Sequence, residues 1–115
     1  MKPEWLDDEL LASQPDHVRL LSIALMLMAD DHGRGRASVH FVAGEAWRYD
    51  RSPEAIERAR TGLDGLENIR FIRRYVVNGQ SYFEIVNWAK HQRIQHVGKA
   101  RVPSPDEKAS KYEKV

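Results

Sequence analysis

The stretch RFIRRYVVNGQSYFEIV, residues 70–86, decides the fold, because it predicts two strands joined by a two-residue turn. Asn-Gly is the dipeptide that best suits a type I′ hairpin turn, whose two central residues take positive φ. With Asn78 and Gly79 in the turn, one register follows: Val77 opposite Gln80, Tyr75 opposite Tyr82, Arg73 opposite Glu84 and Ile72 opposite Ile85. The aromatic pair and the opposite-charge pair favour this hairpin.

Two helices are predicted well before the hairpin. From Asp16 to Met28 the chain is apolar on nearly all sides, which predicts a largely buried first helix, ended by residues 30–33. A shorter second helix is expected over residues 39–47. The expected core contacts of these two helices are Val18, Leu21, Leu25, Met28, Phe41, Val42, Ala46 and Trp47.

A third helix has the clearest start in the chain, at Ser52, Pro53 and Glu54. Serine is a good N-cap, proline suits the first helical position and an acid there complements the helix dipole. Its expected core stripe is Ile56, Ala59, Leu63 and Leu66. Gly62 and Gly65 lie inside this helix, where each costs about 1 kcal/mol relative to alanine, so close backbone packing is expected there.

Three helices followed by a hairpin predict an α+β, mainly α fold of the winged helix-turn-helix type, with a basic C-terminal tail. At 115 residues the chain suits one domain, expected over residues 1–97. Within it, residues 1–13 are expected to form an arm that docks through its apolar side. Residues 98–115, with Pro103 and Pro105, are expected to be a flexible tail or linker.

Several function classes are disfavoured by the inventory of residues. Without cysteine there is no disulfide framework, Cys-based zinc finger or thiol nucleophile. His91 and His96 miss the spacing of a helical zinc pair, and no HExxH, P-loop, GxSxG or GxGxxG occurs. Asp30, Asp31 and His32 suit a helix-ending turn better than a metal site. We therefore expect no enzyme activity, cofactor or metal.

The chain is also expected to be cytoplasmic and to have no membrane partner. Its longest apolar run, residues 20–29, is half of the about 20 residues that cross a bilayer, and no signal-peptide pattern opens the sequence.

The net charge of +1 conceals segregated charges. Residues 1–69 hold eight Lys or Arg against thirteen Asp or Glu, whereas residues 70–102 hold seven against one, Glu84. Residues 103–115 hold three of each. A basic segment of this kind indicates a polyanionic partner, although a solvated face that balances an acidic N-terminal half is the alternative.

Parts of the chain resemble a family, the winged-helix N-terminal domains of phage and prophage replication proteins related to DnaD-type replisome organisers. In the first third the matching residues are Lys2-Pro3, Trp5, Asp8-Glu9-Leu10, Arg19-Leu20-Leu21 through Ala29-Asp30, and Gly33-Arg34. In the last third they are Phe71-Ile72-Arg73-Arg74-Tyr75, Val77, Gly79, Tyr82, Ile85-Val86-Asn87-Trp88 and Lys90-His91-Gln92. The run ending at His91-Gln92 is the most specific.

The resemblance covers residues 2 to about 105 and implies a DNA-binding or replisome-loading module. The middle helices match only in pattern. Relatives often continue into a longer C-terminal region, which this sequence lacks, so self-sufficiency in replication is in doubt. Duplex DNA is the favoured partner, with single-stranded DNA and replisome or host proteins as further candidates, and a dimer as one open oligomeric state.

The candidate DNA contacts lie in three places. On the third helix they are Arg51, Ser52 and Arg58, where Ser52 and nearby amides favour a phosphate. On the hairpin they are Arg74, Asn78 and Gln80, with Arg73 occupied by Glu84 and Arg74 the freer arginine. After the hairpin they are Lys90, His91, Gln92, Arg93, Lys99 and Arg101, beside Trp88 as a packing anchor.

The candidate DNA contacts on the third helix and the hairpin have alternative interpretations. Glu54 and Glu57 share the exposed face of the third helix, and Glu54 can pair with Arg58 at i, i+4, which describes a salt-bridged solvent face. The stem of Arg74 can instead cover Phe83. The rival functions are a protein-interaction adaptor, favoured by Glu54 and Glu57, and a transcriptional repressor, which needs a specific operator.

Overall fold

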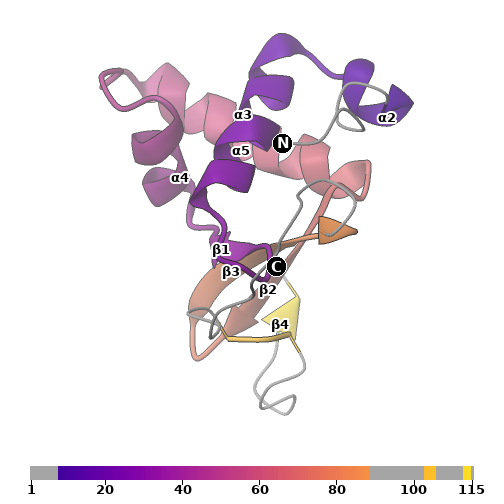
Figure 1. Cartoon of the computed structure of the whole chain (residues 1–115). Helices are drawn as coiled ribbons and strands as arrows, with labels where there is room; N and C mark the ends of the chain where they lie inside the picture. The colour runs from indigo at the N-terminus through magenta and orange to yellow at the C-terminus, as the bar shows by residue number, and fades with distance from the viewer. Residues whose placement is uncertain (1–7, 89–102, 106–112, 115) are drawn as a thin grey trace.

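The computed structural model describes residues 8–88, 103–105 and 113–114. Helices occupy one end of the molecule and an antiparallel sheet the other (Figure 1). In chain order the described elements are α2 (Glu9–Ala12), α3 (Asp16–Met28), β1 (Arg34–Arg36), α4 (Val39–Ala46), α5 (Pro53–Asn68), β2 (Ile72–Val77), β3 (Gln80–Ile85) and β4 (Glu113–Lys114).

The β2–β3 hairpin has the predicted register. Its four expected cross-strand pairs are all present. Asn78 and Gly79 have φ values of 52° and 79°, the positive values that a type I′ turn requires. The two tyrosine rings of the Tyr75–Tyr82 pair stack with their centroids 5.7 Å apart. Turn chemistry and cross-strand pairing therefore agree, as the sequence predicted.

A third strand, β1, was not predicted. It pairs antiparallel with β3 and sets Gly35 opposite Phe83, so the sheet order is β1-β3-β2-β4. The three residues of β1, Arg-Gly-Arg, contain no apolar side chain and thus lack the alternation that marks a half-buried strand. Its side chains contribute no apolar surface, and the strand depends on its pairing with β3.

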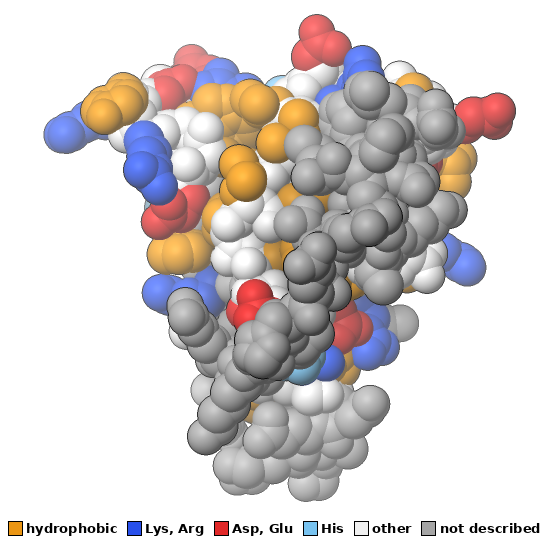
Figure 2. Space-filling model, in the orientation of Figure 1, with side chains coloured by type: hydrophobic (Ala, Val, Ile, Leu, Met, Phe, Trp, Pro, Cys, Tyr) orange, Lys and Arg blue, Asp and Glu red, His pale blue; other side chains and the backbone are white. Residues whose placement is uncertain are grey.

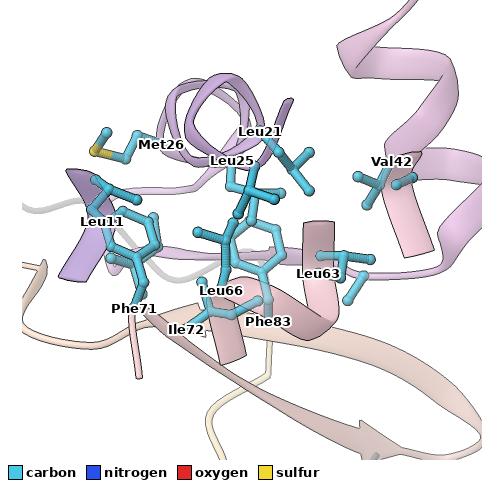
Figure 3. Packing of buried hydrophobic residues seen from close by; sticks show 14 of the residues in the cluster. Leu11, Leu21, Leu25, Met26, Val42, Leu63, Leu66, Phe71, Ile72 and Phe83 are labelled. Atoms are coloured by element: carbon cyan, nitrogen blue, oxygen red, sulfur yellow. The ribbon is translucent and has the colours of Figure 1, made fainter. Parts of the chain in front are cut away.

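The core lies between the helices and the inner face of the sheet. Figure 3 shows Leu21 and Leu25 of α3 beside Leu63 and Leu66 of α5, with Phe83 of β3 among them. These five side chains have no exposed surface. The helices and the sheet therefore share one continuous core, as expected for a single domain.

Helix α5 has the predicted start and stripe. Ser52 occupies the N-cap position and Pro53 the first turn, Ala59, Leu63 and Leu66 are buried, and Ile56 is partly buried against the same core. The expected close packing at Gly62 is confirmed, because a Cβ built there would lie 2.6 Å from Leu21 Cδ2. The absence of a side chain at this position lets α5 approach α3.

The prediction of a largely buried helix holds for only one face of α3. Val18, Leu21 and Leu25 are buried, but Leu20 is 47% and Leu27 81% exposed. Only one face of α3 meets α5 and the sheet, since no described element covers the opposite face. Apolar composition alone could not reveal which face would be left open.

The two ends of the chain contact the domain where they are described. In the N-terminal arm, Leu11 is 1% exposed, whereas residues 1–7 lie outside the described residues. Within residues 98–115, the Pro103 carbonyl accepts a hydrogen bond from Tyr75 Oη at 2.8 Å, and β4 pairs with β2. At these two places the chain lies against the sheet rather than leaving it.

The whole is an α+β fold with an antiparallel sheet of order β1-β3-β2-β4, in which the β2–β3 hairpin follows the helices, consistent with a winged-helix-like topology. Within the described ranges, no helix is long and apolar enough to cross a membrane.

Candidate nucleic-acid interface

The start of α5 is organised by the carboxylate of Asp50. Asp50 Oδ1 accepts hydrogen bonds from the hydroxyl and from the backbone amide of Ser52, and Oδ2 pairs with Arg58. The Ser52 hydroxyl and amide, followed by the Arg58 guanidinium, lower the pKa of Asp50 to about 2. An ionised carboxylate therefore stands at the helix start where Ser52 was expected to favour a phosphate.

Arg58 does not pair with Glu54, the partner that its i, i+4 spacing suggested. Its guanidinium bonds Asp50 and lies over the Trp47 ring, 5.2 Å from the ring centroid. The Arg58 side chain is only 32% exposed. Arg51, by contrast, is exposed and forms no ion pair within the described part of the chain. Of the two arginines predicted here, Arg51 is the one available to an outside anion.

The Asp50 cluster predicts an acid-dependent loss of stability. Because the pKa of Asp50 is lower in the folded chain than the usual value of about 3.9, ionised Asp50 stabilises the fold. This contribution is complete above about pH 4 and is lost as the pH falls through about 2. Denaturant titrations between these pH values should show a shallower pH dependence for Asp50→Asn than for the unmodified chain.

The direct check is a carboxyl NMR titration of Asp50. We expect a midpoint near 2 that rises in Ser52→Ala, because that variant removes the hydroxyl donor but keeps the amide and Arg58. A titration midpoint at the usual value of about 3.9 in the unmodified chain would show that Asp50 does not form these hydrogen bonds and this ion pair.

Arg74 is not the freer arginine. Its side chain is 12% exposed and turns inward to α5, where Nη2 donates to Asp64 and to Glu67, each at 2.7 Å. Burial lowers the pKa of the guanidinium, but the hydrogen bonds to Asp64 and Glu67 raise it more, so Arg74 stays charged. The predicted DNA contact from Arg74 would first have to break two ion pairs.

On the outward face of α5, acidic residues of the helix form ion pairs with the neighbouring arginines. Arg60 Nη1 donates to both carboxylate oxygens of Glu57, each at 2.9 Å, and Asp64 and Glu67 hold Arg74. Glu54 remains as a further exposed acid on the first turn. This face presents little net positive charge to a phosphate backbone, which agrees with the salt-bridged alternative.

The outer face of the sheet carries the opposite balance. Glu84 accepts from Arg73 at 2.9 Å, as the register predicted, and also from Arg34 at 2.8 Å. The three residues lie directly across β1, β3 and β2 from one another. One carboxylate thus balances two guanidinium groups and leaves one positive charge among these three residues.

Arg34 and Arg36 were missed as candidate residues because the sequence did not predict β1. Arg36 is exposed at the end of that strand and lies over Phe41, 4.4 Å from the ring centroid. The Arg-Gly-Arg pattern was the available signal, but only the pairing of β1 with β3 brings it beside Arg73. With Arg73, these two arginines form what we call the sheet-face cluster.

The hairpin tip projects the polar residues that were predicted there. Asn78 and Gly79 are exposed, and Gln80 is partly so. Nothing within 4 Å crowds a Cβ built at Gly79. The tip is therefore accessible, and Arg36, which lies opposite Tyr82, is the member of the sheet-face cluster nearest to it in the register.

Trp88 follows the hairpin as the predicted packing anchor. Its Nε1 donates to the Asp31 carbonyl at 3.0 Å, and its ring lies against Gly33, whose φ is 77°. Asp30 closes the same turn, because its Oδ1 accepts the amides of His32 and Arg34. The predicted contacts Lys90, His91, Gln92, Arg93, Lys99 and Arg101 lie outside the described residues.

The fold and the surface together define an α+β protein with a winged-helix-like topology, an acidic helix face and a positive sheet face. No family model, curated protein or solved structure matches the chain.

Proposed function

We propose that this protein binds DNA as a winged-helix module, with the β2–β3 hairpin as its wing, and that it acts in the initiation of phage or prophage DNA replication. The observation that carries the proposal is the pairing of β1 and the wing into a sheet whose outer face has excess positive charge. The replication role rests on the resemblance of the sequence to phage replication proteins.

The charge distribution favours phosphate contacts over base contacts. The sheet-face cluster and the polar tip residues Asn78 and Gln80 belong to one sheet, and the basic residues 90–101 follow the wing in the chain. Side chains of these kinds contact phosphate oxygens and fix a protein on the duplex without reading sequence. We therefore propose a sequence-tolerant binder that prefers duplex DNA.

The ion pairs on α5 also favour phosphate contacts over base contacts. In winged helices, the second helix of the helix-turn-helix enters the major groove. Here its outward face holds acids that already pair with its arginines. Base readout from α5 would require these ion pairs to break, so α5 contributes little to affinity apart from Arg51.

The test is fluorescence anisotropy of labelled duplex and single-stranded DNA across a salt series. Log affinity for duplex should fall linearly with log salt, by about 0.9 for each phosphate neutralised. Replacing Lys90 and Arg93 by alanine should make this slope shallower by about two such steps, and Arg73→Ala by about one.

A matched control distinguishes the loss of a DNA contact on the sheet face from the loss of one positive charge anywhere on the protein. Arg60 is 54% exposed, close to the 51% of Arg73, but it lies on α5 and pairs with Glu57. Arg60→Ala should leave the slope unchanged. If neither form of DNA binds at low salt, or if Arg60→Ala and Arg73→Ala have equal effects, the proposal is wrong.

A second candidate function is a protein-interaction adaptor in the replisome. The specific observation in its favour is the acidic face of α5, where Glu54, Glu57 and Asp64 are exposed. Such a face suits a basic protein surface. Capture of a replisome or host protein that is lost in Glu54→Lys, without any DNA binding, would favour the adaptor.

A further inference from the structure

An apolar groove runs between α3 and α4. It encloses about 380 Å³ and is lined by Leu20, Ile23, Ala24 and Leu27 of α3 and by Ala46 of α4. Figure 2 shows hydrophobic side chains gathered along α3 in the middle of the view. The groove is the surface on which the exposed apolar side chains of α3 lie.

The exposure of these leucines is unusual for a helix that also supplies the core. Leu27 is 81% and Leu20 47% exposed, and the two are separated by two helical turns. Ile23 and Ala24 fill the turn between them, so the four residues form a continuous stripe with the spacing of a helix–helix seam. Contiguous apolar surface of this kind marks an interaction site.

We propose that this groove is the contact between two copies of the chain, packed about a two-fold axis with the two α3 helices antiparallel. In a two-fold contact the same patch is used by both subunits, so it must complement itself. In this stripe the large Leu20 of one copy would meet the large Leu27 of the other. The small Ala24 lies at the centre, where it allows the helices to approach.

The charges at the rim of the groove have the same self-complementarity. Glu45 and Arg48 line the groove on its α4 side and pair with each other at 3.0 Å. Helix α4 runs antiparallel to α3, because Phe41 near its start lies with Met28 and Ala29 at the end of α3 (Figure 1). Glu45 therefore lies toward the Leu27 end and Arg48 toward the Leu20 end.

A two-fold axis that sets Leu20 opposite Leu27 also sets Arg48 of each copy opposite Glu45 of the other. Arg48 is 69% exposed and free to turn outward, so two reciprocal ion pairs can form at the rim. A two-fold axis parallel to α3 would instead place the two α4 helices on opposite sides of the α3 pair, where these reciprocal ion pairs could not form. The apolar stripe and the charged rim thus favour the same antiparallel orientation.

The first experiment is sedimentation equilibrium of the full chain over a concentration series up to about 1 mM. We expect a dimer whose dissociation constant rises about a hundredfold or more in Leu27→Glu, since two leucines leave the contact. The control is Leu10→Glu on α2, which makes the same change at a side chain that is 58% exposed but outside the groove. It should dimerise normally.

The rim gives a second set of variants. Arg48→Glu should weaken the dimer by opposing Glu45 of the other copy, and the exchange Glu45→Arg with Arg48→Glu should restore it. Thermal melts of all variants report folding separately, and because the changed side chains lie at the surface, we expect their folded fractions to match the unmodified chain.

Cross-linking tests the orientation in a chain that has no native cysteine. Ala24→Cys should form a disulfide with its own copy, because it lies next to the axis, within the roughly 7 Å between Cα atoms that a disulfide allows. Leu20→Cys and Leu27→Cys should cross-link to each other when mixed but not each to itself. Leu10→Cys should not cross-link.

A monomer throughout the concentration series would overturn the proposal. A dimer unaffected by Leu27→Glu would place the contact elsewhere. Self-linking of Leu27→Cys would overturn the antiparallel orientation. None of these outcomes depends on whether the chain binds DNA.

Discussion

Phe83→Ala is expected to lower the free energy of unfolding by about 3–5 kcal/mol, the cost of removing a fully buried aromatic ring. Phe83 lies on β3, between β1 and β2, and has no exposed surface. Its ring lies among side chains from α3 and α5 (Figure 3). Because both helices and the sheet contribute to the surroundings of the ring, the cavity cannot close by the movement of one element.

Urea denaturation measures this loss, with an unchanged slope as the sign that the compactness of the two states is preserved. Tyr49→Ala is the matched control, because Tyr49 is an aromatic residue that is 98% exposed. Its effect should stay within about 0.5 kcal/mol. A loss below about 1 kcal/mol for Phe83→Ala would mean that the helices and sheet do not share the core described here.

Gly35→Ala is expected to lower the free energy of unfolding by about 1–3 kcal/mol through overpacking. Gly35 is the cross-strand partner of Phe83, and a Cβ added to it would lie 2.6 Å from Cε2 and 2.7 Å from Cζ of that ring. Phe83 has no exposed surface and so has no free space to move into. The ring occupies the place of the missing side chain.

Gly44→Ala is the matched control for this substitution. Gly44 lies inside α4 with nothing within 4 Å of its added Cβ, so alanine should stabilise the chain by about 1 kcal/mol through helix propensity. A cycle with Phe83→Leu adds a test of mechanism. The smaller side chain should reduce the cost of Gly35→Ala, whereas additive effects would show that the two residues do not clash.

Local chemistry made the hairpin and α5 predictable. Asn78-Gly79 selects one turn type, and the turn sets the register, so the pair Arg73–Glu84 followed directly. Ser52-Pro53 marked the start of α5, and its apolar spacing predicted the buried stripe. The close packing at Gly62 was expected because a helix interior tolerates glycine mainly for such a reason.

The candidate site was less predictable because its geometry depends on partners distant in sequence. Arg74 was expected to be free, but Asp64 and Glu67 hold it across the junction of α5 and β2. Arg58 was assigned to Glu54 by helical spacing, but it bonds Asp50 in the preceding turn. In both cases the arginine formed an ion pair with a carboxylate that helical spacing did not suggest.

The sequence by itself determined the features that are decided within a few residues, which are the hairpin, its register, the start of α5 and the core stripe. Only the tertiary structure decided that Arg34-Gly35-Arg36 is a strand, since its formation depends on pairing with β3 and on the Phe83 ring over Gly35. It also decided which face of α3 stays open. The sequence pattern shows which faces of a helix are apolar, but the packing of neighbouring elements decides which of those faces is covered.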